Sequence, residues 1–125
     1  MAKQKMLGKY VSRDEIKCHC GCGQDIVDND LIDMLDKIRE HFGKPIIIHC
    51  VNRCERHNKN VGGVPGSKHI TGNAADFHIK KIKTSKVVKE CKKLWKRKEI
   101  ITGGFGTYSW GCHVDTGRYR TWSGK

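Results

Sequence analysis

The stretch DNDLIDMLDKIREHFGKPIIIHC, residues 28–50, decides the fold. Its first half predicts a helix, because apolar residues recur at helical spacing and either Asp28 or Asn29 can cap the start. The apolar positions are Leu31, Met34, Leu35, Ile38 and Phe42. Gly43 and Pro45 then end the helix, since glycine accepts the left-handed conformation and proline blocks extension. The run PIIIHC that follows predicts a short buried strand.

The remaining chain predicts a second long helix and three further strands. Alternating side chains favour a strand over residues 74–79, and a helix begins at Thr84 or Ser85. Two short strands are expected near residues 104–108 and 111–115. Residues 1–26, 51–68 and 116–125 are expected to be irregular or polar loops. We therefore expect an α+β fold, with a small mixed or antiparallel sheet and two main helices gathered on one side of it.

Length and charge limit the possible functions. A chain of 125 residues predicts one domain, residues 1–125, with an ordered core over about residues 10–122. It has 25 Lys and Arg against 13 Asp and Glu, a net charge of +12, which indicates an anionic partner. No run of about 18 apolar residues exists, so we expect no membrane-spanning helix. The basic start is followed by no apolar segment, so we expect synthesis in the cytoplasm without a signal peptide.

Seven cysteines, an odd number, favour reduced thiols over a full set of disulfides. Cys18, Cys20 and Cys22 alternate in the text C-H-C-G-C. Zinc sites generally use C-x2-C or wider spacing, so this pattern is only a weak indication of a structural metal. We interpret the three residues as a loop of packed, reduced cysteines and keep a second metal site as the alternative.

Two histidines and one aspartate form a candidate zinc site. His69 and Asp76 are separated by six residues where a loop meets a predicted strand, and His113 lies on a later strand. Zinc accepts imidazole nitrogen and carboxylate oxygen, and three protein ligands leave a fourth position for water. Such a site activates water as a nucleophile near neutral pH. The small residue Gly72 lets the ligand segment pack closely against its neighbours.

The residues around these ligands carry a specific resemblance. The pattern S-x-H-x-x-G-x-A-x-D is complete, and H-V-D follows at residues 113–115. Its fixed positions are Ser67, His69, Gly72, Ala74 and Asp76. This resembles the zinc D-Ala-D-Ala carboxypeptidases of bacterial cell walls, a family that includes cell-wall endopeptidases and phage endolysins. The segments KCHCGCG, GKPIII, NRCERHN, VGGVPGSKH and HVDTGRYRTW also match one subgroup in order, so the resemblance spans about residues 10–122.

The resemblance implies a fold, a cofactor and a substrate. The fold would be like that of the hedgehog domains and D-Ala-D-Ala peptidases, with Zn²⁺ held by His69, Asp76 and His113. Arg53 would bind a substrate carboxylate, and Ser67 would also contact substrate. The implied activity is hydrolysis of peptide bonds in peptidoglycan stems, by a monomer acting at the bacterial cell wall after release, as phage or prophage lysis enzymes do. Peptidoglycan and anionic wall polymers would be its partners.

One position departs from the family pattern. Many relatives carry an acidic general base three residues before the last histidine ligand, where this chain has Trp110. Asp115 lies on the same strand face as His113 and is the predicted catalytic residue, as general base or as the group that orients His113. His49 is expected to be buried and structural. Cys112 should point to the opposite face from His113, which argues against a Cys–His pair.

Two other functions compete with a peptidase. The segment from residue 80 to 98 holds ten basic residues and one acidic residue, which fits a nucleic-acid-binding domain. Few aromatic residues interleave with these lysines, so we do not expect nucleic acid to be the partner. The second alternative is a non-catalytic zinc domain of the hedgehog type, which only the absent acid at Trp110 supports.

Overall fold

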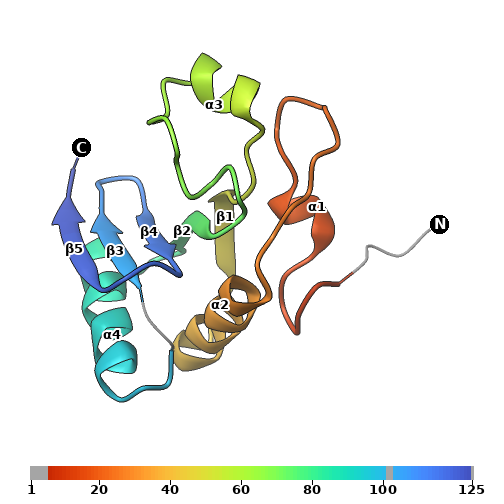
Figure 1. Cartoon of the computed structure of the whole chain (residues 1–125). Coiled ribbons are helices and arrows are strands. Elements are labelled where there is room, and N and C mark those ends of the chain that lie inside the picture. Colours follow the sequence, from red (N-terminus) through yellow and green to blue (C-terminus); the bar gives the residue numbers. More distant parts are fainter. Residues whose placement is uncertain (1–5, 101–102, 125) are drawn as a thin grey trace.

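The computed structural model describes residues 6–100 and 103–124 and contains a five-stranded mixed sheet with four helices (Figure 1). The strands are β1 (Ile46–Cys50), β2 (Ala74–Ile79), β3 (Gly104–Thr107), β4 (Cys112–Asp115) and β5 (Arg120–Ser123). The helices are α1 (Arg13–Ile16), α2 (Asn29–Phe42), α3 (Glu55–Asn60) and α4 (Thr84–Lys96). The α+β prediction is confirmed. Residues 1–5, 101–102 and 125 of the predicted domain lie outside the described residues.

The strands lie in the order β1-β2-β4-β3-β5. All neighbouring pairs are antiparallel except β3 and β5, which run parallel, so the sheet is mixed. Strand β4 lies between β2 and β3 although it follows both in sequence. This order brings residues from the middle and the end of the chain onto one pair of adjacent strands.

Helix α2 begins and ends as the sequence predicts. The Asp28 side chain accepts a hydrogen bond from the Asp30 amide at 3.0 Å, and Gly43 closes the helix with a φ of 63°. The Gly43 amide donates to the Arg39 carbonyl, which satisfies one of the last helical acceptors. The buried side of α2 carries Leu31, Ile32, Met34, Leu35 and Ile38.

One hydrophobic core joins the two long helices to the sheet. Helix α4 contributes Val87, Val88, Cys91 and Leu94, and the central strands contribute Ala75, Phe77, Phe105, Cys112 and Val114. Side chains alternate across a strand, so the residues between these core positions face the other way. Asp76 and His113 are two such residues, so these two predicted metal ligands lie on the face of the sheet opposite the core.

Three elements were not predicted. Helix α1 lies in the segment expected to be irregular, α3 lies within the expected loop 51–68, and β5 lies in the polar tail. The sequence did carry a signal for α1, because Ser12 and Glu15 form the S-x-x-E pattern of a capping box. In the structure the Ser12 amide donates to the Glu15 carboxylate at 2.9 Å, as this pattern predicts. Among the described residues, no helix has the length and apolar character needed to cross a membrane.

Candidate metal and substrate site

The sheet brings the three predicted metal ligands together. Asp76 on β2 and His113 on β4 are directly paired across the two strands. His113 Nδ1 lies 2.8 Å from Asp76 Oδ1, and His69 Nε2, from the turn before β2, lies 3.2 Å from Asp76 Oδ2. One ligand atom from each residue lies within 4.8 Å of the others. The six residues between His69 and Asp76 thus form a turn and the start of strand β2.

The second nitrogen of each imidazole is held by another group. His69 Nδ1 donates to the Val51 carbonyl at 2.8 Å, and His113 Nε2 lies 2.9 Å from Asp115 Oδ2. These contacts fix the ring orientations and leave His69 Nε2 and His113 Nδ1 facing Asp76. Metal-binding histidines in proteins are characteristically held in this way. Two imidazole nitrogens and a carboxylate oxygen also match the donor set of a catalytic zinc ion, so the residues fit the metal.

Charge is concentrated at the same three side chains. Burial alone would lower the pKa of His69, but hydrogen bonding to Asp76 outweighs it and raises this pKa to about 9. Burial would raise the pKa of Asp76, yet hydrogen bonds from His113 and His69 hold it well below its usual range. Asp76 is therefore a carboxylate between two imidazoles that favour their positive form. A divalent cation bound by the three side chains would replace the protons on the imidazole nitrogens that face Asp76.

Asn52 positions the His69 turn and was not identified from the sequence. Its buried side-chain amide donates to the carbonyls of His69 and Ile70 at 3.0 and 3.2 Å, and its oxygen accepts from the Ile26 amide at 3.0 Å. It therefore ties the ligand turn to the segment that precedes α2. The only signal in the sequence is its place beside Arg53.

Arg53 and Ser67 lie where a substrate would approach. Both line a cavity of about 430 Å³ that also reaches His69, His113 and Asp115. The Arg53 amide donates to the His69 carbonyl at 3.0 Å, while its side-chain Nε is buried without a hydrogen-bond partner among the described residues. Ser67 Oγ accepts from the His69 amide at 3.2 Å. An unpaired guanidinium nitrogen beside the ligand cluster is suited to binding a carboxylate.

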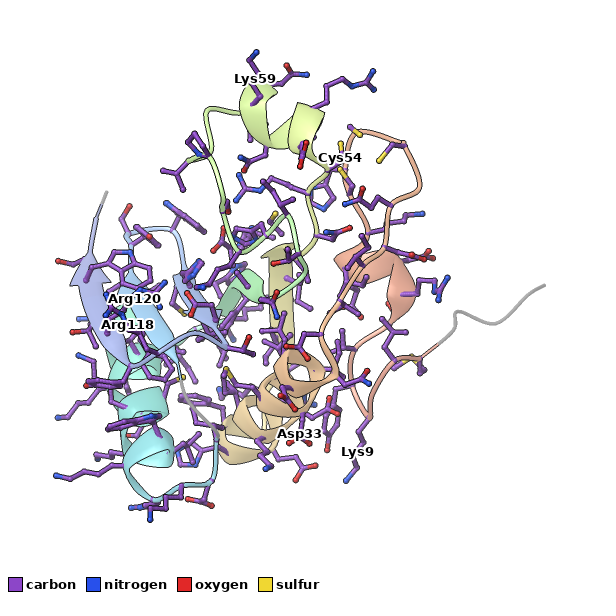
Figure 2. All side chains as sticks on the ribbon, viewed as in Figure 1. Lys9, Asp33, Cys54, Lys59, Arg118 and Arg120 are labelled. Carbon is purple, nitrogen blue, oxygen red and sulfur yellow. The ribbon has the colours of Figure 1, made fainter. Side chains whose placement is uncertain are left out.

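Asp115 is buried behind His113 and makes many contacts. Besides His113, its carboxylate accepts from the amides of Gly104 and Gly117 at 3.1 and 2.9 Å. Arg120 on β5 grips both oxygens, at 3.0 and 2.8 Å, and Figure 2 shows Arg120 on that edge strand. Burial opposes ionisation, but hydrogen bonds from His113 and Arg120 hold the pKa of Asp115 well below its usual range. Arg120 was not identified from the sequence, because its strand was not predicted.

Three neighbouring residues show where the sequence expectations succeed and fail. Cys112 is buried in the core, opposite His113 as predicted, and burial raises the pKa of its thiol to about 12. The prediction that His49 is buried is wrong: His49 is exposed, because it lies on the outward side of β1, where its ring nitrogen contacts His78 at 2.6 Å. Trp110 is also exposed and stacks on Tyr108.

Comparison with known proteins agrees with this geometry. The sequence model of the family Peptidase M15 matches residues 9–115, a range that includes the three candidate ligands, Arg53 and Asp115. The comparison with curated proteins gives no match.

Proposed function

The chain belongs to the peptidase M15 family, and from this premise we propose that it is a zinc-dependent hydrolase of peptidoglycan stem peptides. The observation that carries the proposal is the group formed by His69, Asp76 and His113 beside a cavity that is also lined by Arg53, whose Nε is buried without a hydrogen-bond partner among the described residues. A structural role alone would require neither the open cavity nor an Arg53 Nε without a hydrogen-bond partner.

The metal would be held by His69 Nε2, one oxygen of Asp76 and His113 Nδ1. When bound, zinc polarises the scissile carbonyl and activates water for attack. The contribution of the protein is to keep these donors rigid: Val51 and Asp115 fix the two rings, and Asn52 fixes the turn that carries His69. Because the donors are already held in place, little conformational entropy is lost when the site forms for the reaction.

Arg53 would select the substrate. Its fork can bind a terminal carboxylate at two points, which favours a stem peptide that ends in a free D-amino acid over an uncharged chain. Ser67 lies in the same cavity and supplies a hydroxyl for the peptide backbone. This supports a carboxypeptidase, or an endopeptidase that recognises a nearby carboxylate.

Asp115 would act through His113. Its two oxygens already accept five hydrogen bonds, and the side chain is fully buried. A carboxylate in this state is a weak proton acceptor, whereas it orients an imidazole well. We therefore propose Asp115 as a positioning residue, in place of the general base that the sequence also allowed.

The basic surface would retain the enzyme on the wall. The lysines of α4 at positions 86, 89, 93 and 96 are exposed opposite the buried side of that helix. Anionic wall polymers provide the complementary charge. Action at the cell wall after release from the cytoplasm, as by a phage or prophage lysis enzyme, is part of this proposal.

Digestion of purified peptidoglycan tests the function directly. The zinc-loaded protein should release fragments whose masses, measured by mass spectrometry of the muropeptides, identify the bond that is cut. EDTA should abolish release, and His69→Ala should be inactive. Intact muropeptides after prolonged digestion by the zinc-loaded protein would exclude a peptidoglycan hydrolase and favour the non-catalytic zinc domain. Nucleic-acid binding with no digestion would favour the remaining alternative.

A further inference from the structure

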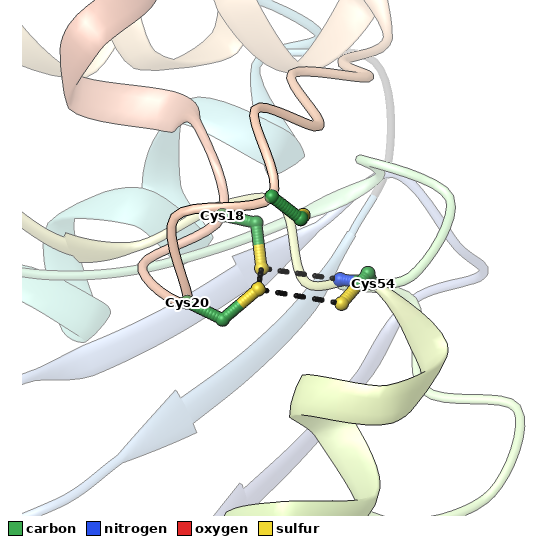
Figure 3. Close-up of side chains that lie close together, drawn as sticks. Cys18, Cys20 and Cys54 are labelled. Carbon is green, nitrogen blue, oxygen red and sulfur yellow. Dashed lines mark hydrogen bonds between the residues drawn. The ribbon is translucent and has the colours of Figure 1, made fainter.

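Four cysteine sulfurs converge outside the peptidase site. Three come from the loop of residues 18–24, and the fourth is Cys54, which directly precedes α3. Cys18 Sγ lies 3.5 Å from Cys20 Sγ, and Cys20 Sγ lies 3.7 Å from Cys54 Sγ (Figure 3). Cys22 completes the group, and all four sulfurs lie within 4.8 Å of one another. Sequence spacing could not reveal this, because Cys54 is far from the other three along the chain.

The distances suit a tetrahedral metal centre. Zinc binds thiolate at about 2.3 Å, and tetrahedral angles then place neighbouring sulfurs about 3.8 Å apart. The Cys18–Cys20 and Cys20–Cys54 sulfur separations, 3.5 and 3.7 Å, are close to this value. A disulfide needs sulfurs at about 2.05 Å, and all seven cysteines are free thiols. Four soft sulfur donors select zinc over the oxygen-seeking ions calcium and magnesium.

The loop is shaped so that alternate residues can converge. Gly21 and Gly23 have φ values of 85° and 84°, a conformation that side-chain-bearing residues rarely adopt, and a Cβ on either would meet nothing within 4 Å. These glycines are therefore required for the turn and not for space. The Cys18 amide donates to the Gln24 carbonyl at 2.8 Å and closes the loop.

Backbone amides also point at the sulfurs. The Cys54 amide donates to Cys18 Sγ at 3.4 Å, the His57 amide to Cys54 Sγ at 3.4 Å, and the Gln24 amide to Cys22 Sγ at 3.5 Å. Such donors stabilise thiolates and orient them, as partners of metal ligands commonly do. Three of the four sulfurs thus already have an amide donor.

Hydrogen bonds such as that from the Ile26 amide to Asn52 Oδ1 join the two segments, and a metal ion would strengthen this connection. Apart from the buried Cys18, no residue from 17 to 26 or from 52 to 73 belongs to the hydrophobic core or packs against it as a partly buried apolar residue. In Figure 1 the loop and α3 lie side by side at one end of the molecule, and Figure 3 shows their sulfurs between them. Arg53 adjoins Cys54 in sequence, so a link here also fixes one wall of the substrate cavity.

We propose that Cys18, Cys20, Cys22 and Cys54 bind one structural Zn²⁺, separate from the ion at His69. The four thiols release their protons to solvent as the metal binds, and the resulting centre joins the loop of residues 18–24 to the start of α3. The proposal does not depend on peptidase activity.

Metal content and cobalt spectra test it on the intact protein. Elemental analysis of wild type prepared under reducing conditions should give two zinc ions per chain, and one each for Cys20→Ser, Cys54→Ser and His69→Ala. The matched control Cys91→Ala removes a thiol outside the cluster and should retain two. With Co²⁺ alone as the probe, wild type and His69→Ala should show thiolate-to-cobalt charge-transfer absorption, which Cys20→Ser should lose.

The outcomes separate this site from the peptidase site. Wild type with a single zinc that His69→Ala abolishes, or a cobalt form without thiolate absorption, would overturn the cysteine site and leave the proposed function standing. A native mass short by two hydrogens per disulfide within the cluster would overturn it as well. If the serine variants do not fold, the cobalt spectra of wild type and His69→Ala decide the question alone.

Discussion

Two carboxylates contact the same imidazole and differ in their surroundings. Asp76 meets His113 Nδ1 with its side chain 18% exposed, whereas Asp115 meets Nε2 from a fully buried position. The first can share a metal ion, and the second can only act through the ring. At the scale of single residues, this difference distinguishes a group that can bind the metal, Asp76, from a group that positions the His113 ring, Asp115.

Asp115→Asn tests the positioning role. We expect zinc affinity at the peptidase site to fall about 10- to 100-fold, along with activity at limiting zinc, because the amide cannot replace the carboxylate that holds His113. Zinc titration and kcat measured on one preparation check this. If kcat stays about 100-fold low with zinc bound normally, Asp115 is the general base instead. Normal values of both would show that the residue does neither.

Arg53→Ala should weaken the recognition of substrate. A lost charge-assisted contact costs about 1.5–3 kcal/mol, or roughly one to two decades in kcat/KM on stem peptides. Arg53→Lys should recover little, because an ammonium cannot replace the two-point fork. The matched control is Arg56→Ala, an exposed arginine on α3, which should have nearly wild-type kinetics. An unchanged kcat/KM for Arg53→Ala would remove this residue from the site.

At the scale of elements, the sequence predicted those parts whose pattern is local. Helix α2, β2 and β4 were predicted nearly to the residue, because capping and alternation are written in adjacent positions. Strand β5 was missed because a four-residue edge strand with alternating half-buried and exposed residues carries little hydrophobic pattern. Because β5 was not predicted, the contact of its residue Arg120 with Asp115 was not predicted either. The burial of Asp115 therefore could not be predicted from the sequence.

Gly72→Ala should destabilise the ligand turn. Gly72 has a φ of 70°, and a Cβ there would overlap the Ile26 carbonyl and Val27 Cα. Left-handed strain and steric overlap together should lower the free energy of unfolding by about 2–4 kcal/mol. Gly62→Ala has a similar φ but open space, so it should cost only about 1–2 kcal/mol. Urea unfolding of both variants checks the difference, and equal losses would contradict the role of the close contact.

The lysine surface of α4 should govern attachment and not chemistry. Changing its four exposed lysines to Gln should lower binding to whole walls and reduce the dependence of that binding on salt. The lysines are Lys86, Lys89, Lys93 and Lys96. Cleavage of a short soluble peptide should change little, and a large loss would mean that α4 shapes the active site. A control with the same charge change replaces exposed lysines elsewhere: Lys9, Lys17, Lys37 and Lys44.

At the scale of the whole molecule, the two faces of the sheet differ in role: one packs the hydrophobic core, and the other carries the candidate metal ligands. One face carries the core with α2 and α4, and the other carries Asp76 and His113. The sequence predicted the three ligands from the short spacing between His69 and Asp76, a distant histidine on a predicted strand, and the resemblance to a zinc peptidase family. It could not predict the cysteine cluster or the contacts of Asn52, which join segments far apart along the chain.

Removal of metal should therefore abolish activity while the sheet stays folded. EDTA should abolish peptide cleavage, and added Zn²⁺ should restore it, while far-ultraviolet circular dichroism keeps its strand signal because the core lies on the other face. The melting temperature should still fall, since an ion that binds only the folded state stabilises it. Cleavage that survives complete removal of zinc would contradict a metal-dependent peptidase.

The position of β4 between β2 and β3 has a consequence for synthesis on the ribosome. The antiparallel pair β1–β2 and strand β3 leave the ribosome before β4, the strand that joins them, so a nascent chain has one strand pair and a separate third strand. The same late strand delivers His113, and β5 then delivers the Arg120 guanidinium to Asp115. Closure of the sheet and assembly of the candidate metal ligands are thus one event, so a chain halted before β4 would lack the proposed peptidase activity.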